Sequence, residues 1–133
     1  MVLEDSPELE VWLLNQWAGT LRQRGGELQF QYSERWLAQP QAIALSQSLP
    51  LQAEPFTDQH CRPFFAGLLP EGQLRQRIAQ QCQISRSNDF GLLAAIGGRL
   101  QAGDAFRQEP LVGDIVMLIE QRCALTLRRL TPG

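Results

Sequence analysis

An alternation of apolar and polar residues from Leu9 to Tyr32 constrains the fold of this chain more than any other feature. A period of two places alternate side chains on opposite faces of a β-strand, so one face of each strand is buried. The alternation is interrupted at Asn15-Gln16 and at Arg24-Gly25-Gly26, where tight turns are favoured. Three alternating runs joined by two turns predict an antiparallel β-meander.

Two tryptophans flank the first of these turns. Trp12 falls between the apolar positions of the first run, whereas Trp17 is in step with Gly19 and Leu21 of the second. The two indole rings are therefore expected on opposite faces of the sheet, which leaves at least one of them exposed.

Residues 33–59, which follow the meander, contain several short patterns. Ser33 is a suitable N-cap for a short helical turn that carries Trp36 and ends before Pro40. Residues 42–48 predict a further strand, and residues 52–59 have the composition of a loop.

Helices are predicted in the second half. Pro63 suits a first helical position, and an apolar stripe follows it. A second helix is expected where Leu74, Ile78 and Cys82 recur at four-residue spacing. A sheet followed by a helical layer predicts an α+β fold.

A third helix is expected to start at Ser87 or Asn88, with Asp89 in its first turn, and to end at Gly97-Gly98. Arg99 to Pro110 then has the composition of a loop. Residues 115–122 fit a short amphipathic helix, and Cys123-Ala-Leu-Thr-Leu127 fits a strand.

The basic residues exclude several kinds of chemistry. All 12 cationic side chains are arginine, so the sequence has no lysine that could form a Schiff base, bind phosphate in a P-loop or take part in kinase chemistry. The single histidine, His60, leaves no multi-histidine metal site, and a net charge of −2 argues against direct nucleic-acid binding. We expect no catalytic residues, no cofactor and no metal.

Cysteine usage and the absence of long apolar runs indicate a cellular location. Cys61, Cys82 and Cys123 are odd in number and far apart, which suggests a reducing compartment. The acidic first eight residues do not resemble a signal peptide. Runs such as 115–119 are too short to span a membrane, so a cytoplasmic protein is expected.

Four groups of residues resemble functional motifs, but ordinary structural roles explain them more simply. Asp89-Phe90-Gly91 spells the metal-binding tripeptide of kinases, yet helix capping and core packing explain it. The glycine spacing from Gly98 to Gly103 matches a P-loop, but Asp104 stands where lysine is required, so a loop is expected. His60 and the cysteines lack metal-site spacing. The arginines of a modest basic face are expected to be solvated: Arg75, Arg77, Arg86, Arg128 and Arg129.

The apolar stripe after Pro63 is the candidate partner-binding surface. It is wider than one small sheet requires, although at least two of its side chains are expected in the core. The candidate contact residues are Phe64, Phe65, Leu68, Leu69, Pro70 and Glu71. Whichever phenylalanine is exposed would be the aromatic anchor.

Five segments in order carry a family resemblance. They are Val11-Trp12-Leu13-x-Asn15-x-x-x-Gly19-x-Leu21, Phe30-x-Tyr32 with Trp36-Leu37, Ala44-Leu45-Ser46-x-Ser48-Leu49-Pro50-Leu51, Phe64-Phe65-x-x-Leu68-Leu69-Pro70-Glu71-Gly72, and Phe90-x-Leu92-Leu93-x-x-Ile96-Gly97. Together they resemble the N-terminal subdomain 1 of HipA-type toxin kinases, the bacterial persistence kinases, and its stand-alone HipS-like small antitoxins. The resemblance implies a small antiparallel, barrel-like sheet packed with short helices and without catalytic residues.

The resemblance divides the chain into an extension (1–8), a HipA-like domain (9–98) and a divergent tail (99–133). In the family, a Gly-Ala-Val-Thr-Leu-like strand usually follows the Ile-Gly segment, whereas here Gly98 continues into an unmatched stretch. Residues 123–127 supply that strand after an insertion, or the tail is an unrelated ending.

The resemblance implies a non-catalytic antitoxin that docks on and restrains a HipA-like serine/threonine kinase encoded nearby. The alternative is an inactive, truncated remnant of such a kinase, and an enzyme in its own right is a third class. A separate DNA-binding antitoxin in the same complex would provide the only contact with DNA.

Overall fold

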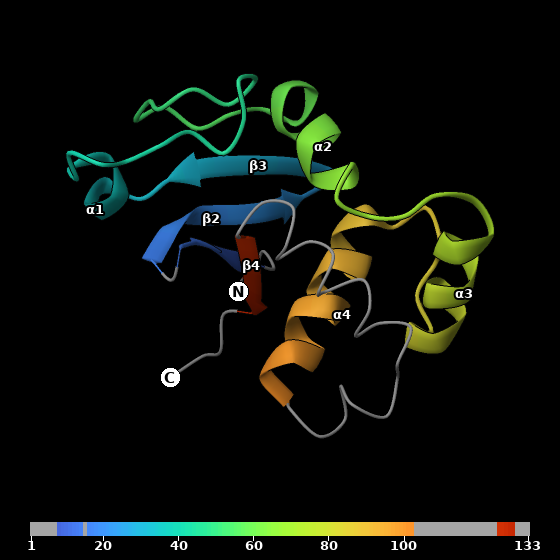
Figure 1. Cartoon of the computed structure of the whole chain (residues 1–133). Coiled ribbons are helices and arrows are strands. Elements are labelled where there is room, and N and C mark those ends of the chain that lie inside the picture. The colour runs from blue at the N-terminus through green and yellow to red at the C-terminus, as the bar shows by residue number, and fades with distance from the viewer. Residues whose placement is uncertain (1–7, 15, 103–124, 130–133) are drawn as a thin grey trace, which may run out of the picture.

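The computed structural model describes residues 8–14, 16–102 and 125–129, which form one sheet covered by helices (Figure 1). The elements in chain order are β1 (Glu8–Leu13), β2 (Gln16–Arg24), β3 (Glu27–Tyr32), α1 (Glu34–Leu37), α2 (Asp58–Ala66), α3 (Gly72–Cys82), α4 (Asp89–Ala102) and β4 (Leu125–Arg129). The predicted α+β class and the three-stranded meander are confirmed. No helix in the described ranges is long and apolar enough to cross a membrane.

The sheet has the order β3-β2-β1-β4, and every neighbouring pair is antiparallel. β4 overlaps the strand predicted over 123–127 in residues 125–127 and extends to Arg129. It pairs with β1, with Val11 opposite Leu127. The sheet is open rather than barrel-like among the described strands, because its edges β3 and β4 do not pair with each other. Phe56 instead forms a single antiparallel bridge with Phe30 on the free edge of β3.

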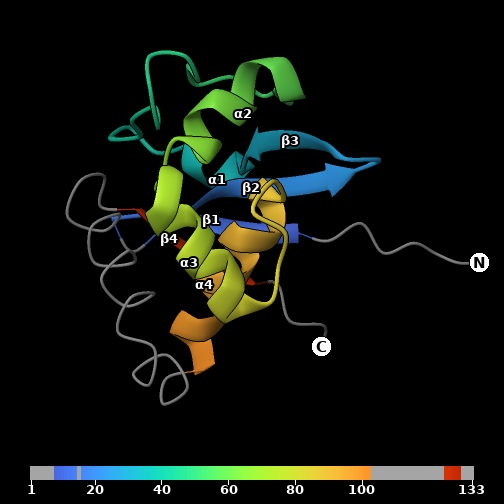
Figure 2. The same cartoon turned by 90° about the vertical axis from the view of Figure 1, so that its right-hand side faces the viewer.

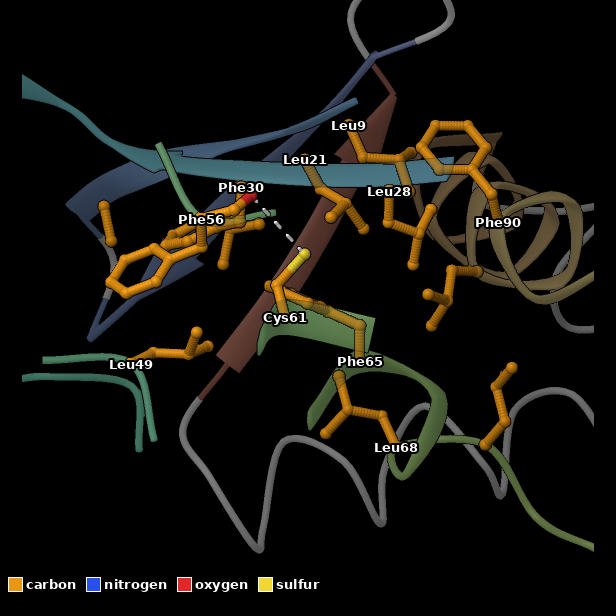
Figure 3. Packing of buried hydrophobic residues seen from close by; sticks show 14 of the residues in the cluster. Leu9, Leu21, Leu28, Phe30, Leu49, Phe56, Cys61, Phe65, Leu68 and Phe90 are labelled. Carbon is orange, nitrogen blue, oxygen red and sulfur yellow. Dashed lines mark hydrogen bonds between the residues drawn. The ribbon is translucent and has the colours of Figure 1, made fainter. Parts of the chain in front are cut away.

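One continuous core lies between the sheet and the helices (Figure 3). The strands contribute Leu9, Val11, Leu21, Leu28 and Phe30, and the helices contribute Cys61, Phe65, Ile78, Phe90 and Leu93, all at most 4% exposed. α2 packs on β3, α3 packs on α4, and α4 packs on β4 (Figures 1 and 2).

A β-bulge changes the predicted position of Trp17. The register shifts between Val11 and Trp12, so that Trp12 pairs directly with Trp17 while Val11 pairs with Gly19. Paired residues lie on the same face, and Ala18 takes the buried position instead. The prediction of opposite faces was therefore wrong, although Trp17 is exposed, as expected for at least one ring.

Gly19 is required because two strands and an aromatic ring converge on it. A Cβ atom there would lie 2.5 Å from the Gln31 carbonyl oxygen and 2.6 Å from Cζ of Phe30. The glycine therefore lets the buried phenylalanine pack directly on the backbone of β2.

The prediction of a strand over residues 42–48 was wrong. This segment makes only one bridge, between Ser46 and Leu49, and is held by side chains of the preceding elements. The Tyr32 hydroxyl donates to the Leu49 carbonyl (2.5 Å) and accepts from the Leu45 N–H (2.9 Å). The Trp36 indole donates to the Ile43 carbonyl at 3.0 Å. These bonds replace a strand ladder.

The helix capping predictions are confirmed at two positions. The Ser33 hydroxyl accepts from the Trp36 N–H at 3.0 Å, which caps α1. The Asn88 side chain accepts from the Gly91 N–H at 2.9 Å, which caps the start of α4.

Two helices are longer than predicted. α2 begins at Asp58 and carries Pro63 in its interior, because the Asp58 carboxylate anchors its first turn to β3. α4 continues through Gly97-Gly98 to Ala102, since packing on β4 offsets the low helix propensity of glycine. The loop expected from Arg99 is thus helical up to Ala102. The rest of that loop and the helix expected over 115–122 lie outside the described residues.

Candidate partner-binding surface

The structure divides the predicted contact residues between the core and the surface. Phe65, Leu68 and Leu69 are 0%, 6% and 4% exposed, so they belong to the core of this chain and present almost no area to a partner. The Phe65 ring packs against Phe30 of β3, with centroids 5.3 Å apart, and Leu68 and Leu69 belong to the same core cluster. The expectation that at least two stripe residues are core is met.

Phe64, Pro70 and Glu71 are the candidate residues with accessible surface. Phe64 and Pro70 are half-buried, and Glu71 is exposed at the start of α3. The Phe64 ring meets the buried Phe65 ring edge-on, with centroids 5.0 Å apart. Phe64 is therefore the phenylalanine that can serve as an anchor, and its ring is held in place from below.

A charged network fixes the position of α2 against the sheet. The Arg62 guanidinium binds Asp58 through Nε (2.8 Å) and Nη2 (2.7 Å), and it also binds Asp89 (2.9 Å). Its Nη2 further donates to the Gly26 carbonyl in the β2–β3 turn at 2.8 Å. Asp58 in turn accepts from the Leu28 N–H at 2.7 Å.

These contacts change the proton affinities of the two central groups. Hydrogen bonds from Arg62 and from the Leu28 N–H lower the pKa of Asp58. The same pairing with Asp58 raises the pKa of Arg62, so both groups are charged at neutral pH. The spacing of Asp58 and Arg62, four residues apart on one helix, is a signal that sequence reasoning could have used.

Asp89 extends the network to α3, because the Arg75 guanidinium also pairs with its carboxylate. Arg75 donates in addition to the Arg86 carbonyl at 2.7 Å. The side chains of Arg75 and Asp89 are each only 14% exposed. No sequence spacing indicates this contact, which only the packing of α2, α3 and α4 creates.

The Asp89-Phe90-Gly91 tripeptide has the structural role predicted for it. Asp89 pairs with two arginines, and Phe90 is 4% exposed in the core. Gly91 lies against the capping side chain of Asn88, where a Cβ atom would approach within 2.5 Å. The stretch with P-loop glycine spacing was expected to be a loop, but its described residues, Gly98 to Ala102, are helical and belong to α4.

Two residues considered for metal or nucleophile chemistry, His60 and Cys61, are neighbours on α2 but differ in exposure. Cys61 is buried, and burial raises the pKa of its thiol to about 11. His60 is exposed on α2, where its Nδ1 bonds the Thr57 hydroxyl at 3.1 Å. In the described part of the chain, no group of three or more potential ligands is placed to hold a metal ion.

The predicted basic face is only partly solvated. Arg77 and Arg86 are exposed, but Arg75 is engaged in the charged network. The side chains of Arg128 and Arg129 lie outside the described ones.

Comparison with known protein families shows which kind of domain this chain contains. The family of the HipA N-terminal domain matches residues 9–103. The chain belongs to the HipA N-terminal domain family. That domain is not the catalytic part of HipA proteins.

Relatives of this HipA N-terminal domain differ in length. The chain is 47% identical over 91 residues to a Sinorhizobium fredii protein named "Putative kinase Y4mE", a match that covers 68% of this chain and 22% of the relative. The chain thus spans about a fifth of that protein. An uncharacterised protein of Haemophilus influenzae is 30% identical over 100 residues, which cover 75% of this chain and 91% of that protein.

A solved structure described as the N-terminal domain of HipA toxin has the same fold. It aligns with a TM-score of 0.61 at 22% identity and covers 99% of this chain and 100% of that one. The HipA-type fold predicted from the five motifs is therefore confirmed.

Proposed function

We propose that this HipA N-terminal domain is a non-catalytic binding module of a type II toxin–antitoxin system. In this proposal it docks on a HipA-like serine/threonine kinase encoded nearby and restrains it. A separate DNA-binding antitoxin joins the same complex and provides any contact with DNA.

One observation carries the proposal: the residues that match the HipA N-terminal domain, 9–103, contain a hydrophobic core of their own. The relative from Haemophilus influenzae supports a separate module, because this chain aligns with 91% of it. In a longer relative such as Y4mE, the rest of the chain is covalently attached to the domain, so a face for that contact is expected on it.

The docking surface that we propose consists of Phe64, Pro70 and Glu71. Phe64 is a half-buried aromatic side chain whose ring is supported by Phe65, so little side-chain freedom is lost on binding. The Arg62 network holds α2 on the sheet, which makes the surface rigid before the kinase arrives. Aromatic anchors of this type commonly dominate interface energies.

The test is co-expression with the neighbouring kinase, affinity purification and a growth assay. We expect a stoichiometric complex and rescue of growth from kinase toxicity. Phe64→Ala is expected to weaken the complex by more than about 2 kcal/mol, roughly 30-fold in Kd, and to reduce the rescue. Ile43→Ala is the matched control, because Ile43 is an exposed apolar residue outside this surface.

The outcomes separate this function from the remnant alternative. Equal Kd values for the wild type and Phe64→Ala would contradict the proposed docking surface but not the proposed function as a binding module. A cooperatively folded chain that neither binds the kinase nor rescues growth would contradict the antitoxin function and favour an inactive remnant.

A further inference from the structure

An aromatic hollow is formed by residues of β1, β2 and α1. These elements meet at the end of the sheet where β1 turns into β2 (Figure 1). Its volume is about 350 Å³, and it is lined by Trp12, Gln16, Trp17, Arg35 and Gln39. The two tryptophans pair across β1 and β2 on the face of the sheet opposite the core. The hollow is therefore on a different side of the molecule from Phe64, which lies on the helix that covers the core face.

Hydrogen bonds within the chain hold both indole rings in place. The Trp12 Nε1 donates to Glu10 at 3.1 Å, and the Trp17 Nε1 donates to the Gly19 carbonyl at 2.8 Å. With these polar atoms bonded inside the chain, the rings present mainly apolar area, and Trp17 is 37% exposed. Rings that are fixed in advance lose little conformational freedom when a ligand covers them.

Leu14, in the adjoining turn, adds apolar area that folding does not explain. Its side chain is 56% exposed, and its φ of 52° lies in the left-handed region. Asparagine or glycine adopts that conformation at lower cost than leucine. Leu14 therefore gains little from burial and adds backbone strain, which is consistent with a role in contact with another molecule.

The polar side chains around the hollow indicate what it binds. Among the described residues that line the hollow, Arg35 alone is charged, and its position on α1 is exposed. The nearby Glu10 carboxylate is engaged by Trp12. Gln16 and Gln39 supply amide groups that can bond a peptide backbone. A cationic, aromatic and amide-lined surface complements a carboxylate beside an apolar side chain.

We propose that this hollow binds an acidic peptide segment of a partner protein, with an apolar side chain against Trp12 and Trp17 and a carboxylate on Arg35. The inference does not rest on the proposed kinase function, since it uses a separate surface and other residues. A domain with both surfaces links two protein segments at once.

The test selects short peptides from a random displayed library on the full chain, with counter-selection on the Trp17→Ala/Arg35→Ala variant. We expect the surviving peptides to carry Asp or Glu within a few residues of an aliphatic or aromatic side chain. A synthetic peptide of that sequence should change the tryptophan fluorescence, because Trp12 and Trp17 line the hollow. The third tryptophan, Trp36, is only 2% exposed, so the peptide should not affect its emission. Arg35→Glu should weaken its binding by at least about tenfold, and amidation of its carboxylates should have a similar effect.

A second variant separates binding from folding. Leu14→Asn relieves a strained, exposed position, so its thermal unfolding temperature should equal or exceed that of the wild type, while peptide affinity falls severalfold. The proposal is overturned if no peptides survive the counter-selection, if the survivors are basic, or if affinity is unchanged in both Arg35→Glu and Leu14→Asn. Tighter binding of single-stranded oligothymidylate than of any peptide would also overturn it, since stacking on tryptophan then serves a nucleic acid.

Discussion

At the scale of single residues, a few polar side chains join elements that are far apart in the sequence. Asp58 and Arg62 connect α2 to the β2–β3 turn and to the start of β3. Tyr32 connects the end of β3 to the segment around Leu45 and Leu49. Each of these side chains meets backbone groups, so its removal leaves donors or acceptors unpaired.

Asp58→Asn is expected to lower the free energy of unfolding at pH 7 by about 1–2 kcal/mol, because a charged partner of Arg62 is lost. The pKa of Asp58 is lower in the folded than in the unfolded protein, so its contribution is complete above its unfolded pKa, about 4, and disappears as the pH falls through the folded value. The stability gap between wild type and variant should therefore close below about pH 4.

Urea denaturation at a series of pH values measures this gap. Glu54→Gln, which removes a carboxylate from an exposed loop position, is the control. A gap that stays constant into the acid range would contradict the role assigned to the Asp58 charge.

Tyr32→Phe keeps the aromatic ring but removes a hydroxyl that both donates and accepts. We expect a loss of about 1–3 kcal/mol in the free energy of unfolding, because the Leu45 N–H and the Leu49 carbonyl lose a partner. Amide hydrogen exchange at Leu45 should accelerate more than exchange in the centre of β2. Unchanged exchange at Leu45 would contradict this account of the segment.

At the scale of elements, α2 forms although it contains a proline. Pro63 sits at the sixth position of the helix, where it has no N–H to donate to the Gln59 carbonyl. The helix persists because Cys61 and Phe65 are fully buried beneath it and its first turn is bonded to β3 through Asp58. Tertiary contacts therefore outweigh a local sequence preference.

Pro63→Ala is expected to stabilise the protein by about 1 kcal/mol, since it restores a helical hydrogen bond at an exposed position. Part of that gain is offset because alanine has more freedom in the unfolded chain. The thermal unfolding temperature measures the effect, and Ala66→Gly, which lowers helix propensity at the last residue of α2, should act in the opposite direction. A lower unfolding temperature for Pro63→Ala would show that the proline shapes α2.

At the scale of the whole molecule, β4 joins the far end of the chain to the first strand. It pairs with β1 along Leu9 to Leu13 and also packs against α4. The family match ends at residue 103, so this strand lies beyond the matched region. Without it, β1 would present an unpaired edge next to the core.

A chain truncated after residue 102 is therefore expected to lose cooperative unfolding or to aggregate, whereas a chain that ends after residue 129 keeps β4. Size-exclusion chromatography and thermal unfolding compare the two. Equal stability of both chains would contradict a structural role for β4.

The sequence alone determined the parts of this protein that depend on neighbours along the chain. The alternation from Leu9 to Tyr32 predicted three strands, and short polar side chains at Ser33 and Asn88 capped the helices that follow them. These outcomes are governed by backbone geometry within a few residues. The family resemblance was visible for the same reason, since its motifs are these local patterns in a fixed order.

The tertiary structure decided what depends on contacts across the chain. A bulge brought Trp12 and Trp17 together on one face, and packing on β4 carried α4 through two glycines. Contact with the sheet buried Phe65 and left Phe64 accessible, although the two are adjacent in sequence. Which side of a helix is buried depends on the surface that the helix packs against, and the sequence of the helix alone does not specify that surface.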